Sequence, residues 1–145
     1  MSKNIVAQKQ ILRLLDANLN RAKEALRVIE DIARFILDDK SLTYRIKDIR
    51  HGITEAAKSS GIYKKNASIA ARSVKTDVGK TDIISEVKRN DYSDIFFANF
   101  QRAKESTRCL EEFFKLYDIK AAKFLKKLRY KLYTIEKAAA KKISH

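Results

Sequence analysis

Residues that interrupt helices or cross-link chains are scarce in this sequence. It has no proline, no tryptophan, three glycines and one cysteine among 145 residues. This scarcity, together with abundant Ala, Leu, Lys and Glu, predicts an all-helical fold. The single cysteine, Cys109, excludes an internal disulfide and fits a reducing compartment, so we expect a cytoplasmic protein.

Segments that would place the chain in a membrane are also missing. No apolar run approaches the roughly 20 residues that span a bilayer. Met1–Gln10 lacks the apolar core of a secretory signal. We therefore expect no membrane partner. The length of 145 residues fits one domain, 1–145, with a sizeable core.

Acidic residues are too few to balance the basic ones. Lys and Arg number 32 against 18 Asp and Glu, which gives a net charge of +14. Nucleic acid is the usual first candidate partner for such a chain, but a phosphorylated small molecule also suits Arg and Lys in a pocket. The charge alone does not choose between them. The lysines of the C-terminal segment are interpreted as a solvated helix face: Lys120, Lys123, Lys126, Lys127, Lys131, Lys137, Lys141 and Lys142.

An internal repeat organises the chain. Residues 17–30 read ANLNRAKEALRVIE and residues 98–111 read ANFQRAKESTRCLE, with eight of the fourteen positions identical. Self-similarity of this kind indicates a duplicated helical element. Cys109 replaces Val28 in the second copy, so we interpret it as a small packing residue.

Each copy continues a spacing of four and three that predicts one buried helical seam. The seams are Ile11, Leu15, Asn18, Ala22, Ala25, Ile29, Ile32 and Ile36, and Tyr92, Phe96, Asn99, Ala103, Ser106, Leu110, Phe113 and Tyr117. Asn18 and Asn99 are the repeated polar members. A buried amide costs free energy unless its donors and acceptors are satisfied. Each Asn is therefore either a device that fixes helix register or part of a pocket between helices.

Charged residues follow each Asn at steps of three. Arg21 and Arg102 lie at the seam edge, and Glu24 and Glu105 come one turn later. Asn, Arg and Glu are identical in the two copies of the repeat, whereas several seam residues differ between them. Packing alone does not explain this difference, so we favour a pocket between the helices. We interpret Lys23, Lys104 and Arg27 as salt-bridged residues on the solvated flanks of the helices and not as site residues.

Four long helices are predicted, in two hairpins. Their ranges are Gln8–Leu37, Leu42–Ser59, Tyr92–Tyr117 and Ile119–Lys142. Asp38, Asp39 or Ser41 can cap the second helix, Asp91 or Ser93 the third and Asp118 the fourth, and Gly61 can end the second. The hairpins, about 8–59 and 92–142, form a four-helix bundle with an irregular connection over 60–91. Arg50 and Arg129 match in the second helices of the hairpins.

The connection holds a polar set without a known phosphate loop. Gly79-Lys80-Thr81 resembles the end of a Walker motif, but Val74 stands where that motif requires glycine. Arg72, Asp77 and Gly79 remain a set that can hold phosphate and magnesium. His51, beside Arg50, is more often a structural residue in such a position, but it is kept as a binding candidate.

Several separate blocks resemble the small bacterial ThiD2 family, and the match covers nearly the whole chain. The blocks are Leu15–Ala22, Leu26–Phe35, Ile49–His51, Ala71–Ser73, Asp77–Gly79, Ala98–Ala103, Glu105–Ser106 and Leu128–Tyr130. One departure is Ala25, where relatives often have Gly. The resemblance implies a kinase that uses ATP to convert 4-amino-5-hydroxymethyl-2-methylpyrimidine phosphate to the diphosphate for thiamine synthesis. It also implies that the unphosphorylated alcohol is not a substrate.

Residue roles for such a kinase are our own inference. Phosphoryl transfer depends mostly on positioning and charge neutralisation. We expect the following roles: Arg21, Arg102 and Arg72 catalytic at the phosphates; Asn18, Asn99, Arg50, His51, Arg129 and Gly79 in substrate or nucleotide binding; Glu24, Glu105 and Asp77 as ligands of Mg²⁺. By analogy with helical-bundle adenosyltransferases, which bind ATP between subunits, we expect a homo-oligomer.

Two other function classes compete with the kinase. A basic bundle that binds nucleic acid predicts salt-sensitive affinity for polynucleotide and little response to ATP. Phe96, Phe113 and Tyr92 argue against it, because they fall in helix seams and not at exposed stacking positions. An assembly module without activity is the third class.

Overall fold

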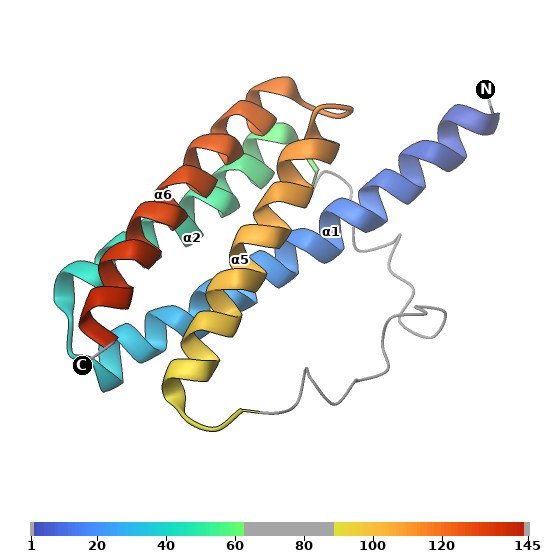
Figure 1. The fold of residues 1–145 in the computed structure, drawn as a ribbon. Coiled ribbons are helices and arrows are strands. Elements are labelled where there is room, and N and C mark those ends of the chain that lie inside the picture. The colour runs from blue at the N-terminus through green and yellow to red at the C-terminus, as the bar shows by residue number, and fades with distance from the viewer. Residues whose placement is uncertain (1, 63–88, 144–145) are drawn as a thin grey trace.

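The chain is all-helical over the residues described, 2–62 and 89–143, with side chains from residue 8 onward. The structure, a computed structural model, contains α1 (Ser2–Asp31), the π-helix η1 (Ile32–Ile36), α2 (Lys40–Ser60), α5 (Tyr92–Phe114) and α6 (Ile119–Ile143) (Figure 1). No strand occurs in these two ranges. The prediction of an all-α bundle is confirmed.

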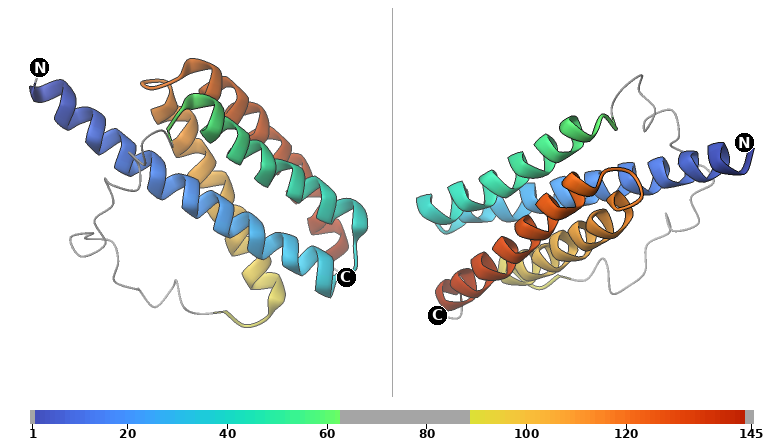
Figure 2. Two further views of the ribbon diagram at one scale, coloured as in Figure 1. Left: turned by 180° about the vertical axis from the view of Figure 1, so that it is seen from behind. Right: turned by 90° about the horizontal axis from the view of Figure 1, so that it is seen from above.

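The helices form a bundle in which every neighbouring pair is antiparallel. α1 packs against α2 and α5, and α6 packs against the same two helices (Figure 2). α2 and α5 run in the same direction, and the first turns of α1 extend beyond the bundle (Figure 1). The most extensive packing joins α1 and α5, which carry the two copies of the repeat.

Polar caps set the helix boundaries where the sequence predicts them. The Asp39 carboxylate accepts a hydrogen bond from the Leu42 N–H at 2.9 Å, and Asp91 accepts from the N–H groups of Ser93 and Asp94. Gly61 ends α2 in the left-handed conformation, with φ 77°. That conformation favours glycine because it has no Cβ.

The predicted bounds of the first and third helices differ most from the structure, whereas those of the second and fourth helices agree within two residues. The first α-helix was expected over Gln8–Leu37, but it begins at Ser2 and gives way to η1 after Asp31. A π-helix has more residues per turn than an α-helix, so it breaks the spacing of four and three on which the prediction rests. The third helix ends at Phe114, three residues before the predicted Tyr117.

The predicted seams form the core except at their ends. Their middle members are buried, among them Leu15, Ala22, Ile29, Phe96, Ala103 and Leu110. The prediction of burial is wrong for Ile36, Tyr92 and Tyr117, which have 53%, 38% and 42% of their surface exposed. Ile36 lies in η1 and Tyr117 follows α5, so the α-helical period no longer directs either one inward. Ala25, the residue at which the sequence departs from the family resemblance, is buried.

Two aromatic rings from the first half of α5 lie in the core. Phe96 and Phe100 are fully buried, with ring centroids 5.0 Å apart and planes inclined by 62°. Such edge-on pairs add about 0.5–1.5 kcal/mol to the free energy gained by burying the rings.

None of the described helices is both long and apolar enough to cross a bilayer.

Truncating Phe100 should therefore weaken the fold strongly. We expect Phe100→Ala to lower the free energy of unfolding by about 3–5 kcal/mol, because it leaves a cavity in the core. Phe97→Ala, at a half-buried position of the same helix, should cost clearly less. Chemical denaturation followed by circular dichroism measures both, and equal losses would contradict this packing.

Candidate functional site

The repeated asparagines occupy equivalent, largely enclosed positions. Asn18 is buried in α1 and Asn99 is half-buried in α5. The Asn18 amide donates to the Leu14 carbonyl at 3.0 Å, and the Asn99 amide donates to the Ile95 carbonyl at 2.8 Å. Each side chain therefore bonds to the previous turn of its own helix. A role for either amide in binding a substrate stays a prediction.

The predicted catalytic arginines and magnesium ligands lie on the surface. Arg21 and Arg102 are exposed and form no ion pair with any described residue. Glu24 and Glu105 are also exposed, and Glu105 accepts a hydrogen bond from Gln101 at 2.8 Å.

No group of three or more His, Cys, Asp or Glu that could hold a metal ion occurs in 2–62 or 89–143. His51 is exposed on α2. Arg72, Asp77 and Gly79 lie outside the described residues. No Mg²⁺ site is thus identified among the described residues, and the roles of Glu24, Glu105 and Asp77 as its ligands stay predictions.

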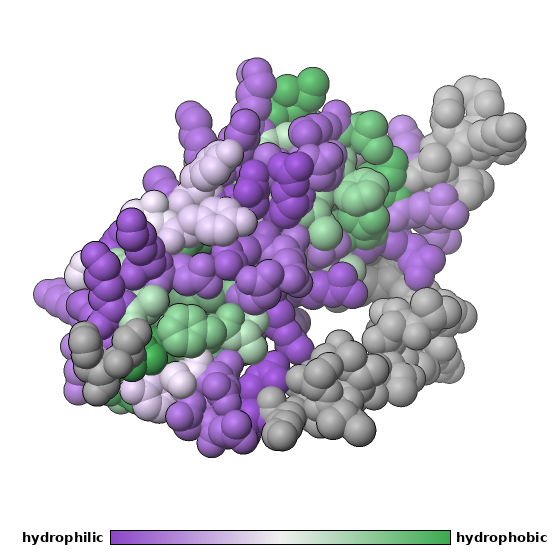
Figure 3. Space-filling view, in the orientation of Figure 1, coloured by the Kyte–Doolittle hydropathy of each residue, from purple (hydrophilic) through white to green (hydrophobic). Residues whose placement is uncertain are grey.

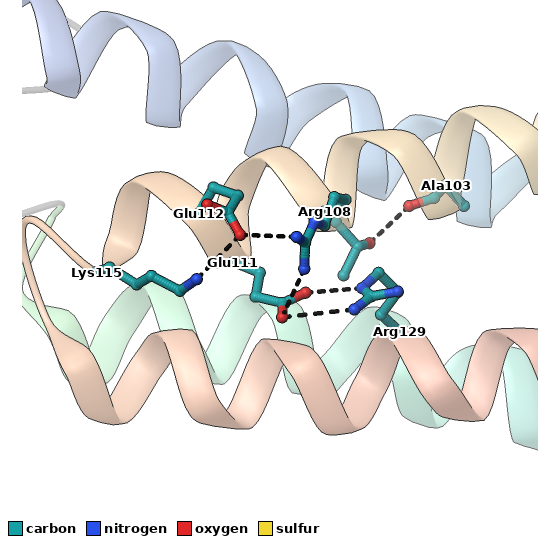
Figure 4. A network of polar contacts seen from close by, with 7 residues as sticks. Ala103, Arg108, Glu111, Glu112, Lys115 and Arg129 are labelled. Atoms are coloured by element: carbon teal, nitrogen blue, oxygen red, sulfur yellow. Dashed lines mark hydrogen bonds and ion pairs between the residues drawn. The ribbon is translucent and has the colours of Figure 1, made fainter.

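A buried carboxylate links the two helices of the second hairpin. Glu111 of α5 has 4% of its side chain exposed and lies between Arg108 of α5 and Arg129 of α6 (Figure 4). The Arg129 Nε donates to Glu111 at 2.7 Å and its Nη2 donates at 3.5 Å. The Arg108 Nη1 donates at 3.1 Å. We refer to these three residues as the Glu111 cluster.

The first hairpin repeats this arrangement with equivalent residues. Glu30 of α1 is 4% exposed at its side chain and accepts two hydrogen bonds from Arg50 of α2, at 2.9 and 3.3 Å. Arg27, one turn earlier, lies 3.5 Å from the same carboxylate. We refer to Glu30, Arg27 and Arg50 as the Glu30 cluster. Each hairpin is thus held by one buried carboxylate and two guanidinium groups.

The charges in the Glu111 cluster favour the ionised carboxylate. Burial alone would raise the pKa of Glu111, but the hydrogen bonds and positive charges of Arg129 and Arg108 outweigh it and lower that pKa. The hydrogen bond to Glu111 raises the pKa of Arg129. A carboxylate so fully paired is a poor proton acceptor, so the cluster is suited to holding helices together.

Sequence reasoning matched Arg50 with Arg129 but missed their partners. It assigned both arginines to substrate binding and gave Glu30 and Glu111 no role. The available signal was an Arg three positions before Glu in both copies, together with an Arg in each second helix. Because Arg50 and Arg129 are 15% and 12% exposed and face buried carboxylates, any substrate contact would compete with these ion pairs.

Two further expectations concern the surface. Lys104 was expected on a salt-bridged, solvated flank. It does form an ion pair, with Glu136 at 2.8 Å, but only 14% of its side chain is exposed, so the expectation of a solvated side chain is wrong. The solvated lysine face of α6 is confirmed, because all eight lysines are exposed. Figure 3 shows a largely hydrophilic face interrupted by small hydrophobic patches.

Aromatic side chains are more exposed than the seams predicted. Among the described residues, the exposed aromatic side chains besides Tyr92 are Phe35, Tyr44, Tyr117, Phe124, Tyr130 and Tyr133. The Arg129 guanidinium lies 5.0 Å from the Tyr130 ring centroid, and Lys104 lies 5.1 Å from that of Tyr133. The argument against nucleic-acid binding, that aromatic side chains are buried in helix seams and cannot stack on bases, therefore does not hold for these exposed residues.

Comparison with known proteins places the chain in a family. Residues 13–138 match the model of the ThiD2 family. The chain belongs to the ThiD2 family. No solved structure gives a significant match.

The chain is also similar to part of several longer proteins. A thiamine-phosphate synthase from Rhodopirellula baltica is 40% identical over 86% of this chain and 33% of its own length. Those from Nostoc punctiforme and Thermosynechococcus vestitus are 39% and 37% identical, over 89% and 90% of this chain and 35% of their own lengths. The chain thus spans about one third of the length of these curated relatives.

Removing one guanidinium from the Glu111 cluster tests its contribution to stability. We expect Arg129→Met to lower the free energy of unfolding by about 3 kcal/mol, because it leaves a buried carboxylate with one exposed partner. The control Arg108→Met changes a side chain that is 53% exposed. It should cost less than about 1 kcal/mol. Urea denaturation measures both, and a cost below 1 kcal/mol for Arg129→Met would refute the assignment.

The same cluster predicts a loss of stability in acid. The folded pKa of Glu111 lies below its ordinary value of 4.5, so its contribution is complete above that pH and is lost as the pH falls through the folded pKa. Glu111→Gln should be less stable than wild type at neutral pH and should lose less stability on acidification. Denaturation at neutral pH and near pH 3 compares the two, and an equal acid loss in both proteins would contradict this linkage.

Proposed function

We propose that this chain is a hydroxymethylpyrimidine-phosphate kinase of thiamine biosynthesis. The observation that carries the proposal is the ThiD2 match over residues 13–138, joined to relatives that are named thiamine-phosphate synthases. The proposed substrates are ATP and 4-amino-5-hydroxymethyl-2-methylpyrimidine phosphate, which we call the pyrimidine phosphate. We also propose that the chain acts in the cytoplasm.

The proposed reaction moves one phosphoryl group. An oxygen of the pyrimidine phosphate attacks the γ-phosphorus of ATP, and the bond from that phosphorus to the β–γ bridging oxygen breaks. The products are the pyrimidine diphosphate and ADP. Because the attacking oxygen belongs to a phosphate that is already ionised near neutral pH, no strong general base is required. Catalysis then rests on positioning and on neutralising negative charge.

Arg21 and Arg102 fit the need for cations at the phosphates. Both are exposed on the repeat helices and form no ion pair among the described residues, so neither has to leave a partner to meet a phosphate. A guanidinium binds two phosphate oxygens at once, which fixes orientation as well as charge. Asn18 and Asn99 retain a carbonyl oxygen that could accept from an amino group.

The donor types present suit magnesium. Mg²⁺ prefers oxygen ligands, keeps several waters and is usually held by one or two carboxylates together with substrate phosphates. Glu24 and Glu105 offer exposed carboxylates of this kind, and Asp77 remains a third candidate outside the described residues. When bound, the ion neutralises phosphate charge.

A site that binds the phosphate of the pyrimidine phosphate would have a physical reason to select this compound over the free alcohol. A cation that is placed to meet this phosphate is left unpaired when the free alcohol binds instead, and such a mismatch is costly. The free alcohol should therefore be a poor substrate.

Kinase turnover tests the proposal directly. We expect the purified chain to form ADP and the pyrimidine diphosphate from Mg-ATP and the pyrimidine phosphate, with little turnover of the free alcohol. Arg21→Ala and Arg102→Ala should each lower kcat/KM by about tenfold or more, because each removes charge-assisted hydrogen bonds. Arg13→Ala, an exposed arginine on α1 outside the repeat, should stay within about twofold, as expected for a surface position.

Two outcomes would overturn parts of this account. No turnover, with salt-sensitive binding of polynucleotide instead, would replace the kinase by the nucleic-acid-binding alternative. Normal turnover in both arginine variants, shown to be folded, would remove the arginines from the site. We propose a homo-oligomer as well, and a monomeric mass by light scattering would contradict it.

A further inference from the structure

The two hairpins differ in the length of their turns. Glu30 and Glu111 occupy the same repeat position, and Asp39 and Asp118 cap the helices that follow them. Nine positions lead from Glu30 to Asp39, but only seven lead from Glu111 to Asp118. The first turn therefore carries two additional residues.

The π-helix and one unusual residue accommodate this added length. The Leu37 N–H donates to the Ile32 carbonyl at 3.0 Å, which is the wider hydrogen-bonding pattern of η1. Asp38 follows with φ 50°, the only positive φ of a non-glycine residue in the described ranges. In the second hairpin the Asp118 N–H returns to Phe114 by an ordinary helical step. The first turn is thus wider than the second.

A pocket of about 360 Å³ opens at this wider turn. Glu30 of α1, Arg34 of η1 and Asp38 line one part of it. Asp39, the cap of α2, and the first two turns of α2 line the remainder, the latter with Lys40, Thr43, Tyr44 and Lys47. The volume lies within the range of small-molecule sites, roughly 300–1,000 Å³.

Carboxylates in the pocket are mostly neutralised by residues outside it. Glu30 is paired with Arg50, and Asp39 is paired with Lys142 of α6. The hydrogen bond from the Leu42 N–H, then the contact with Lys142, lowers the pKa of Asp39. Only Asp38 remains as a carboxylate without a described partner.

The cations of the pocket, in contrast, are uncompensated. Arg34, Lys40 and Lys47 form no ion pair with any described residue. Arg34 lies over the Phe35 ring, 4.9 Å from its centroid, but has no carboxylate partner. Three cations without an ion pair therefore meet one such carboxylate, which favours an anionic ligand. The ring of Tyr44 lines the same pocket and is 54% exposed, so it offers an aromatic surface beside these charges.

We propose that this pocket binds an aromatic phosphate ester, with its phosphate on Arg34, Lys40 and Lys47 and its ring against Tyr44. The assignment rests on the proposed function, whose substrates, the pyrimidine phosphate and ATP, both join an aromatic ring to phosphate. A phosphate binds guanidinium and ammonium groups through charge-assisted hydrogen bonds, and a flat ring stacks on tyrosine. The binding site thus belongs to the half of the duplicated fold that has the longer turn. Arg34 comes 13 positions after Arg21, about 20 Å along a helix, so this pocket and the pair Arg21 and Arg102 are alternative sites for the substrate phosphate.

Lys47 has a matched control in the other hairpin. Lys47 lies eight positions after Asp39, and Lys126 lies eight positions after Asp118. Both are lysines of a second helix, Lys126 is exposed, and only Lys47 lines the pocket. The variants Lys47→Ala and Lys126→Ala therefore remove the same charge from equivalent places.

Isothermal titration of the full chain with three ligands tests the pocket. The ligands are the pyrimidine phosphate, a non-hydrolysable ATP analogue and inorganic phosphate. At least one aromatic ester should bind more tightly than inorganic phosphate, and its Kd should rise about tenfold or more in Lys47→Ala. Lys126→Ala should leave that Kd within about twofold, as expected for a charge remote from the ligand. The ester whose Kd rises in Lys47→Ala is the substrate that the pocket binds.

Backbone amide NMR shifts provide an independent readout. Adding the bound ester should perturb the amides of Thr43, Tyr44 and Lys47 more than those around Lys126. Equal losses of affinity in the two lysine variants, no loss in either, or tightest binding of inorganic phosphate would overturn the proposal.

Failure of the pocket and failure of the kinase proposal are distinguishable. Wild-type turnover with unchanged KM and kcat in Lys47→Ala would refute the pocket and leave the kinase intact. Lys47-dependent binding of an aromatic ester by a chain that shows no turnover would refute the kinase and leave the pocket intact.

Discussion

The structure depends on a buried carboxylate that joins the two helices of each hairpin. Glu30 and Glu111 are almost fully enclosed, and each meets one arginine of its own helix and one of the next. An unpaired charge at such a site would be costly, so only the paired geometry is favourable. This constraint fixes how α2 lies on α1 and how α6 lies on α5. It also explains why Arg27 and Glu30 recur as Arg108 and Glu111 while neighbouring apolar residues change.

Duplication gives the bundle two similar halves, and the turns make them different. Caps, ion-pair clusters and seam asparagines recur in both halves. Only the first turn contains η1 and the left-handed Asp38. Repeated features thus account for the fold, whereas the unrepeated turn supplies a polar pocket.

Much of the fold could be predicted from the sequence, because helix period, capping residues and an internal repeat are local signals. Asp39, Asp91 and Gly61 act where their chemistry requires. The π-helix could not be predicted, since Ile32 and Ile36 fit an α-helical period and only the unequal turn lengths mark the insertion. The partners of Arg50 and Arg129 were missed because their pairing joins separate helices. The pocket lies beside the π-helix and is lined by Glu30, the partner of Arg50, so local signals did not reveal it.

The central claim is that equivalent carboxylate–arginine pairs hold the two hairpins, and double-mutant cycles test it most directly. Unfolding free energies would be measured for Glu30→Gln with Arg50→Met, for Glu111→Gln with Arg129→Met, and for each single variant. The account predicts favourable coupling in both pairs, of about 1–3 kcal/mol and similar size. Coupling near zero in both pairs, or in one pair alone, would contradict it.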